Sequence, residues 1–202
     1  MNLFLRCNFL AVLLLCLAGC AQKEKETFPP NTEPLTSVSI KSLDGKIFSV
    51  HDVIKKHRAN VFYFLMPGCP MCESYTRSIN ELDKKFSDKN ISFFGIFSSG
   101  YYSDEEIISY RNDFKVEIPF YRDIDFKLTH ALQATVTPQV FVLDSTANLL
   151  YSGSIDNWAY GTGKKRMEAT EFFLDDALEN IIKGRPVAVK STRAYGCIID
   201  NR

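Results

Sequence analysis

The sequence lacks an excess of charge of either sign. Its 24 lysines and arginines are balanced by 24 aspartates and glutamates, without a long run of one sign, so a nucleic-acid partner is not expected. It also lacks a second C-x-x-C or an H-x-x-x-H pair that would complete a structural zinc site. No internal repeat occurs, and no apolar run is long enough for a mature membrane-spanning helix. Because the ligands of a zinc site are incomplete, we expect no metal, and we expect no other cofactor.

The N-terminal residues have the pattern of an export signal. Arg6 precedes a short apolar run at residues 9–15, which leads into Leu-Ala-Gly-Cys at residues 17–20. This last segment resembles the lipobox of bacterial lipoproteins. The resemblance implies that Cys20 is cleaved free, acylated and becomes the mature N-terminus, with membrane attachment through its acyl chains. An ordinary signal with an incidental cysteine, or an uncleaved anchor, is the alternative interpretation.

The sequence predicts one folded domain with short appendages. The residues after Cys20 are charged and rich in proline, so they bury little surface and are expected to form a tether. We expect a protein of the bacterial cell envelope, lipid-anchored to a membrane, with its domain in the periplasm or at the cell surface. The expected segments are a signal peptide at 1–19, a lipidated flexible tether at 20–36, a folded domain at 37–190 and a C-terminal tail with a cysteine at 191–202.

Three cysteines remain if the signal is removed and Cys20 carries lipid. They are Cys69, Cys72 and Cys197. Export places them in a compartment where disulfides persist, and their number is odd. One of them is therefore free, transiently paired or bonded to a partner.

Strand-like and helix-like segments alternate from residue 37 onward, which predicts an α/β fold. Residues 61–65 form a continuous apolar run rich in β-formers, as in a strand buried on both faces. After Cys69, apolar residues recur every three or four positions up to Phe86, which predicts a helix with one apolar stripe. We expect a central mixed sheet flanked by helices. Further expected elements are an N-terminal β-hairpin at 38–50, strands at 91–97, 140–143 and 149–151, a helix opened by a capping box at 103–106, and a closing helix at 173–182.

The segment at residues 69–72, Cys-Pro-Met-Cys, lies between a predicted buried strand and a predicted helix. A helix N-terminus stabilises an anion, so the pKa of the Cys69 thiol should fall. Cys72 lies one turn further on the same side, where it can resolve a mixed disulfide formed by Cys69. Pro70 fits the first turn of a helix, where its missing N–H costs little. A zinc site or an inert disulfide is the alternative interpretation of the pair.

Two segments resemble the thioredoxin-like superfamily. They are residues 68–72, Gly-Cys-Pro-Met-Cys, and residues 135–144, Thr-Val-Thr-Pro-Gln-Val-Phe-Val-Leu-Asp. More narrowly, they are similar to the redoxin group, which includes alkyl hydroperoxide reductases and thiol-specific antioxidants. The resemblance implies a thioredoxin-like fold and a cis peptide bond before Pro138, facing the cysteines. The exposed backbone of Thr137 would then bind a substrate segment by strand addition.

The sequence departs from two patterns of this superfamily. Thioredoxins carry a buried aspartate in the strand before the cysteines, whereas residues 61–65 contain no acid. Peroxiredoxins carry threonine or serine three residues before the peroxidatic cysteine, whereas Met66 stands three residues before Cys69. A peroxidase is therefore disfavoured. We assign no function to the three histidines, which are His51, His57 and His130.

These observations favour an envelope thiol–disulfide oxidoreductase acting through Cys69 and Cys72. Its expected partners are a protein or small-thiol substrate and an unidentified reductant or oxidant, and the sequence does not fix the direction of electron flow. The alternatives are a thiol peroxidase of the alkyl hydroperoxide reductase type and a non-enzymatic, metal-binding or scaffolding lipoprotein. Cys197 is either an additional redox thiol or a packed thiol of the tail.

Overall fold

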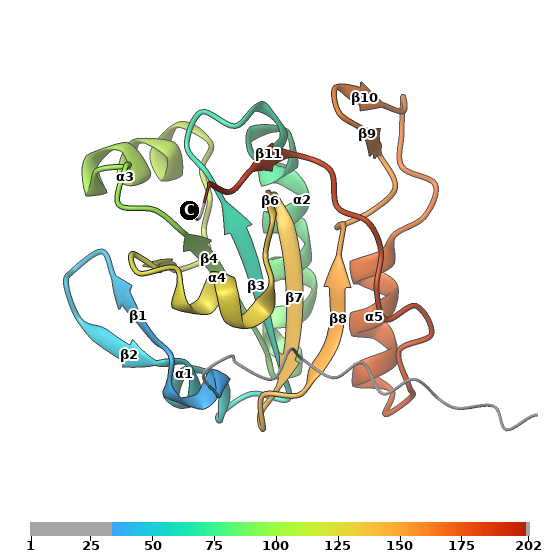
Figure 1. The fold of residues 1–202 in the computed structure, drawn as a ribbon. Coiled ribbons are helices and arrows are strands. Elements are labelled where there is room, and N and C mark those ends of the chain that lie inside the picture. Colours follow the sequence, from blue (N-terminus) through green and yellow to red (C-terminus); the bar gives the residue numbers. More distant parts are fainter. Residues whose placement is uncertain (1–33, 201–202) are drawn as a thin grey trace, which may run out of the picture. The chain divides into compact units, whose positions relative to one another are not determined.

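A seven-stranded mixed sheet forms the centre of the domain (Figure 1). The computed structural model describes residues 34–200, so the predicted signal peptide, Cys20 and most of the predicted tether lie outside the described residues. The strand order is β2-β1-β5-β4-β3-β7-β8; the β3–β4 and β4–β5 pairs are parallel and the other neighbours antiparallel. The strands are β1 (Ser39–Ser42), β2 (Ile47–Ser49), β3 (Ala59–Leu65), β4 (Ile91–Phe97), β5 (Phe120–Arg122), β7 (Gln139–Asp144) and β8 (Leu149–Gly153).

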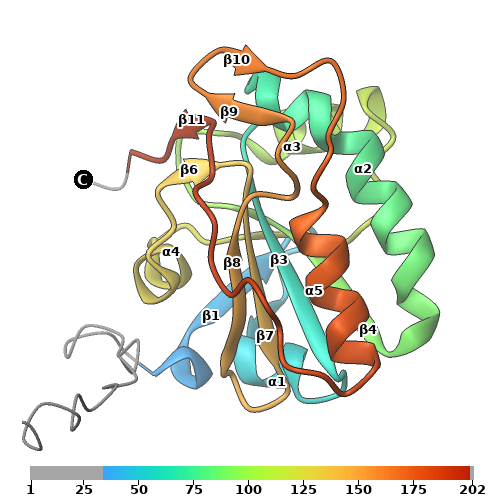
Figure 2. The ribbon, with the colours of Figure 1, turned by 90° about the vertical axis from the view of Figure 1, so that its right-hand side faces the viewer.

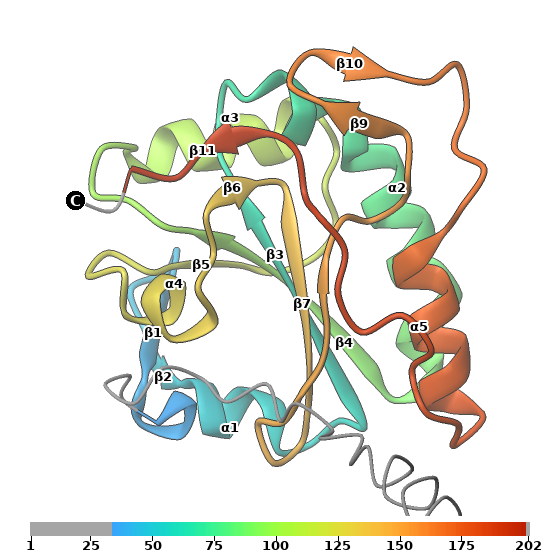
Figure 3. The same ribbon diagram turned by 45° about the vertical axis from the view of Figure 1, so that its right-hand side comes forward.

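Helices cover both faces of this sheet (Figure 3). One core cluster holds the buried side chains of α2, α3 and α5, and the second holds those of α1 and α4. The helices are α1 (Val50–Ile54), α2 (Pro70–Phe86), α3 (Asp104–Asp113), α4 (Lys127–Leu132) and α5 (Phe173–Ile182), with 3₁₀ turns η1 (Leu35–Ser37) and η2 (Ser87–Lys89).

The central strand β3 contributes to both cores because side chains alternate across a strand. Val61 and Tyr63 belong to the cluster under α2 and α5, whereas Phe62 and Phe64 belong to the cluster under α1 and α4. All residues of β3 are buried. The prediction of a strand buried on both faces is confirmed.

Helix α2 follows β3 directly and carries the predicted apolar stripe. Tyr75, Ile79, Leu82 and Phe86 are buried against the sheet. Burial of these side chains fixes the rotation of the helix, and with it the direction in which its first turn faces the end of β3.

The order of elements confirms the predicted fold class. A β3-α2-β4 unit precedes a β7-β8-α5 unit, the β1–β2 hairpin is present, and Ser103 and Glu106 form a capping box on α3. Among residues 34–200, no helix is both long and apolar enough to cross a bilayer. Four short strands complete the described chain: β6 (Val136–Thr137), β9 (Ala159–Gly161), β10 (Lys164–Lys165) and β11 (Cys197–Ile198).

Candidate active site

Cys69 occupies the position immediately before the first turn of α2. Its backbone is extended (φ −86°, ψ 110°), and Pro70 follows at the first helical position. The Cys69 carbonyl accepts a hydrogen bond from the Glu73 backbone N–H (3.0 Å), which opens the helix. The unpaired N–H groups of this helix end favour an anion next to the Cys69 sulfur. The placement predicted for Cys69, between strand and helix, is confirmed.

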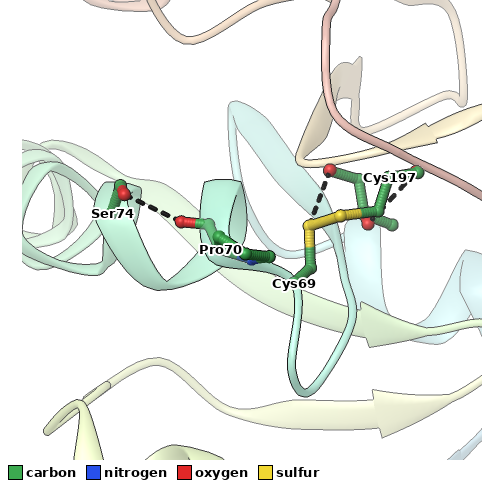
Figure 4. Close-up of a disulfide and its surroundings, with 5 residues drawn as sticks. Cys69, Pro70, Ser74 and Cys197 are labelled. Atoms are coloured by element: carbon green, nitrogen blue, oxygen red, sulfur yellow. Dashed lines mark hydrogen bonds between the residues drawn. A yellow bond between two sulfur atoms is a disulfide. The ribbon is translucent and has the colours of Figure 1, made fainter. Parts of the chain in front are cut away.

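Cys69 forms a disulfide with Cys197, at the other end of the domain sequence (Figure 4). The Cα atoms are 6.2 Å apart, and 128 positions separate the two cysteines. Cys69 is only 1% exposed, whereas Cys197 is partly exposed. An external thiol therefore meets the Cys197 side of this disulfide first.

The tail brings Cys197 to this position by adding a strand beside β6. β11 pairs antiparallel with β6, with Cys197 opposite Thr137 and Ile198 opposite Val136. The Ile199 backbone N–H donates to the Thr135 carbonyl (3.0 Å). The strand-addition surface predicted at Thr137 is thus occupied by the chain's own tail.

Thr137 contacts both cysteines of the disulfide. The Cys69 Sγ atom is 3.4 Å from its carbonyl oxygen, and its side-chain hydroxyl donates to the Cys197 carbonyl (3.4 Å). The peptide bond between Thr137 and Pro138 is cis, as predicted. The structure therefore brings Cys69, Cys197, Thr137 and Pro138 together, and Cys72 also contacts the Thr137 side chain.

A segment before β11 fixes the tail to strand β8 (Figure 2). The Ser152 backbone N–H donates to the Lys190 carbonyl, and its carbonyl accepts from the Thr192 N–H, both at 3.0 Å. The Thr192 hydroxyl accepts a hydrogen bond from the Ser154 N–H (2.9 Å). We call residues 190–193 the anchor segment. Because it ends four positions before Cys197, it limits how far the tail cysteine can move from Cys69 once the disulfide is reduced.

Cys72 is the free thiol among the described cysteines, and it is fully buried. Burial raises the pKa of the Cys72 thiol to about 12, although hydrogen bonds from the Thr137 side chain and the Met66 backbone oppose this shift. The neighbouring charge of Glu73 adds to it. A thiol with this pKa supplies very little thiolate near neutral pH.

No acid of β3 stands ready to take the Cys72 proton. The polar side chains of the strand are the buried Tyr63 and Asn60, whose side-chain amide donates to the Ile54 carbonyl (3.1 Å). Within residues 34–200, the structure contains no group of three or more histidine, cysteine or acidic side chains placed to hold a metal ion. His130 lies in α4 and is stacked on Phe126.

The sequence alone does not identify the partner of Cys69. Cys72 is closer along the chain and has the helical spacing for a redox pair, yet the structure pairs Cys69 with Cys197. The role of Cys72 as resolving thiol stays a prediction. In the sequence, Gly196 and Cys197 resemble a Gly-Cys-x-Ile ending of the redoxin group, but this resemblance does not predict the close contact of Gly196 with Thr137.

The fold and the chemistry of this site define a thioredoxin-like oxidoreductase. The chain belongs to the Redoxin family, whose family model matches residues 23–158. The matched stretch includes Cys69, Cys72, Thr137 and Pro138, whereas Cys197 lies outside it. None of the curated proteins matches the chain.

Solved structures share the fold at low sequence identity. An uncharacterised conserved protein from Geobacillus kaustophilus has a TM-score of 0.71 and 22% identity, over 86% of this chain and 93% of its own. A hypothetical protein from Sinorhizobium meliloti has a TM-score of 0.69 and 20% identity, over 84% of this chain and 95% of its own. A secreted disulfide oxidoreductase from Mycobacterium tuberculosis has a TM-score of 0.50 and 14% identity, over 74% and 96%. These similarities establish the thioredoxin-like fold.

Proposed function

We propose that this protein is a thiol–disulfide oxidoreductase in which Cys69 is the nucleophile and Cys197 the resolving thiol. The observation that carries the proposal is the Cys69–Cys197 disulfide at the N-terminus of α2, beside the backbone of Thr137. The membership of the chain in the Redoxin family supports the same chemistry.

In the reducing direction, the reaction consists of two exchanges. The Cys69 thiolate attacks one sulfur of a substrate disulfide; a new S–S bond forms as the old one breaks, and the departing substrate sulfur leaves as a thiolate. Cys197, as its thiolate, then attacks the Cys69 sulfur, releases the second substrate thiolate and forms the Cys69–Cys197 disulfide. Both leaving thiolates take up protons from water. A reducing thiol pair of a partner returns the enzyme to its dithiol form. In the oxidising direction, one substrate thiolate attacks the Cys69–Cys197 disulfide, and a second substrate thiolate then breaks the resulting mixed disulfide and leaves the enzyme as a dithiol.

Cys197 is better suited than Cys72 to the resolving step. The raised pKa of Cys72 keeps its thiol protonated, and β3 offers no acid to accept the proton. The anchor segment ends four positions before Cys197 and limits how far the Cys197 thiol can move from Cys69, which gives this thiol a high effective concentration. We assign Cys72 to a slower exchange: its thiolate attacks the Cys69 sulfur of the Cys69–Cys197 disulfide, and Cys197 leaves as a thiolate.

Single substitutions of the three cysteines, made in parallel, distinguish their roles. With a disulfide-linked model substrate and a dithiol reductant, Cys69→Ser should abolish turnover, because the attacking sulfur is lost. Cys197→Ser should accumulate mixed disulfides on Cys69, whereas Cys72→Ser should retain most of the turnover. Trapping by Cys72→Ser but not by Cys197→Ser would assign the resolving role to Cys72, and full turnover of Cys69→Ser would refute the proposal.

We also propose that the protein works in the bacterial envelope, held on a membrane by acyl chains on Cys20. The lipobox-like residues 17–20 and the charged, proline-rich residues that follow support this placement. In cell fractionation, the wild-type chain should sediment with membranes and be released by detergent but not by salt. Cys20→Ala should change this partition, and an unchanged partition together with an unmodified Cys20 in mass spectra would exclude the anchor.

A thiol peroxidase is a second candidate, because an intramolecular disulfide at Cys69 is also the end product of that reaction. There the Cys69 thiolate attacks a peroxide oxygen, the O–O bond breaks and a sulfenic acid forms; Cys197 then condenses with it, releasing water. Met66 stands where peroxiredoxins have a hydroxyl, which weighs against this reaction. Stopped-flow measurement of hydrogen peroxide consumption by the reduced protein distinguishes the two, since an exchange enzyme should react no faster than an ordinary thiol.

A further inference from the structure

Gly196, the residue before the tail cysteine, lies against the backbone of β6. A Cβ atom on Gly196 would be 1.9 Å from the Thr137 carbonyl oxygen and 2.6 Å from the Thr137 carbonyl carbon. Any side chain there would collide with main-chain atoms that have little freedom to move. The backbone of Gly196 does not adopt the left-handed conformation, so glycine is needed at this position for space alone.

The two residues after Cys197 alternate between exposed and buried, as in an extended strand. Ile198 is 78% exposed, whereas Ile199 is 5% exposed and belongs to the core cluster under α1 and α4. The Ile199 backbone N–H also donates to the Thr135 carbonyl (3.0 Å). The β6 edge therefore constrains three positions of the strand it holds: a glycine, the cysteine after it, and an aliphatic residue two positions beyond the cysteine.

We propose that this edge selects protein substrates by an extended Gly-Cys-x-aliphatic segment, and that β11 is an internal copy of the substrate. The inference rests on the proposed function, because it assumes that Cys69 exchanges disulfides with a bound segment. Backbone pairing with β6 supplies affinity and the contacts of Gly196 and Ile199 supply selectivity, as in other cases of strand addition. The tail must leave the edge before a substrate segment binds, and it returns when Cys197 resolves the mixed disulfide.

The direct test compares two peptides on the full chain carrying both Cys72→Ser and Cys197→Ser. The first peptide has the sequence of residues 195–200, with its cysteine in a mixed disulfide with thionitrobenzoate, and the second has alanine in place of its glycine. The Cys69 thiolate attacks the peptide sulfur, the Cys69–peptide bond forms, and thionitrobenzoate leaves as a coloured thiolate. The adduct is located on Cys69 by peptide mass mapping. The symmetrical disulfide of thionitrobenzoate is the control reagent.

We expect the glycine peptide to react at least about tenfold faster than the alanine peptide, a ratio that corresponds to about 1.4 kcal/mol. Equal rates for the two peptides, with normal reaction of the small control reagent, would overturn the proposed selectivity and leave the proposed function intact. Failure of Cys69 to react with either peptide or with the small reagent would overturn the proposed function itself.

The proposal that β11 is an internal copy of the substrate is tested by Gly196→Ala in the otherwise unchanged chain. The added methyl group should push β11 off the edge, so that closure of the Cys69–Cys197 disulfide slows by about tenfold or more. Gly100→Ala is the matched control, because a Cβ atom at Gly100 meets nothing within 4 Å. Closure of Gly196→Ala at the wild-type rate would show that the edge accepts a side chain, and the proposal would be wrong.

Discussion

The buried thiol of Cys72 couples the stability of the protein to pH. Its pKa rises from an ordinary value of 9.0 to about 12 on folding, chiefly because burial disfavours the thiolate. Above about pH 9 the unfolded thiol loses its proton while the folded thiol keeps it, so the unfolded state is favoured as the pH rises. The stabilising contribution is complete below about pH 9 and declines up to about pH 12.

Replacing this thiol should flatten the alkaline decline in stability. Cys72→Ala is expected to remove a slope of up to about 1.4 kcal/mol per pH unit above pH ~9, whatever cavity cost it adds at every pH. Urea unfolding of the oxidised wild-type and variant proteins at pH ~8 and pH ~10 measures the difference. Parallel pH dependences would mean that Cys72 is not protonated in the way its burial implies.

Individual site residues differ in how far the sequence predicts them. Cys69 and Thr137 are predictable because each lies beside a strongly patterned strand, β3 or β7. The disulfide partner of Cys69 is not predictable from the sequence, because helical spacing favours Cys72. The observed pairing with Cys197 depends on the path of the tail across the domain. Local patterns carry no information about such a crossing.

The anchor segment holds the tail through hydrogen bonds that converge on one side chain. The Thr192 hydroxyl accepts from the Ser154 N–H (2.9 Å) and bonds with the Tyr151 hydroxyl (2.7 Å). Gly153 allows this contact, because its φ is +138° and a Cβ there would lie 2.3 Å from the Thr192 carbonyl oxygen. The contacts of Thr192 thus help to determine where Cys197, five residues further on, lies relative to Cys69.

Loss of the Thr192 hydroxyl should make the Cys69–Cys197 disulfide easier to reduce. Thr192→Ala leaves the Ser154 N–H without its partner, which costs about 1–3 kcal/mol and lowers the effective concentration of Cys197 in the reduced state. Equilibration with glutathione should show a shift of about tenfold toward the dithiol, or about 30 mV. Ser191→Ala is the control, since the exposed Ser191 hydroxyl makes one long hydrogen bond with Ser152 (3.4 Å). Equal shifts in both variants would contradict the role of Thr192.

Elements with a strong hydrophobic period are the ones that the sequence predicts well. The stripe of α2 and the apolar run of β3 determine their own burial, so both were expected at nearly their observed bounds. The path of residues 185–200 has no such period, because its contacts with β8 and β6 are made largely by backbone groups. Every residue type except proline offers both a backbone N–H and a carbonyl, so composition does not reveal these contacts.

Across the whole molecule, the disulfide joins the junction of β3 and α2 to the C-terminal tail. It spans 128 positions of the sequence, which covers most of the described domain. A link across a loop this long removes many conformations from the unfolded chain; the chain-entropy model gives about 4.7 kcal/mol for a loop of roughly 100 residues. The redox state of the site is therefore coupled to the global stability of the fold.

Reduction should lower the free energy of unfolding by roughly 4 kcal/mol or somewhat less. Chemical unfolding of the protein with and without a strong reductant measures this difference. Cys197→Ser should match the reduced protein in either condition, whereas Cys72→Ser should keep the response to reductant because its disulfide is intact. Identical midpoints for the oxidised and reduced protein would show that the link does not restrict the unfolded chain.

Strand β8 ends the central sheet, and an uncovered sheet edge is a template for pairing with other chains. Ser152 uses its outward N–H and carbonyl to pair with residues 190–192, which lie beside β8 as a short extra strand. None of these bonds involves Cys197, so the proposed departure of β11 from β6 does not require them to break. The proposed opening of the site for a substrate strand would therefore leave the Ser152 backbone groups at the β8 edge paired.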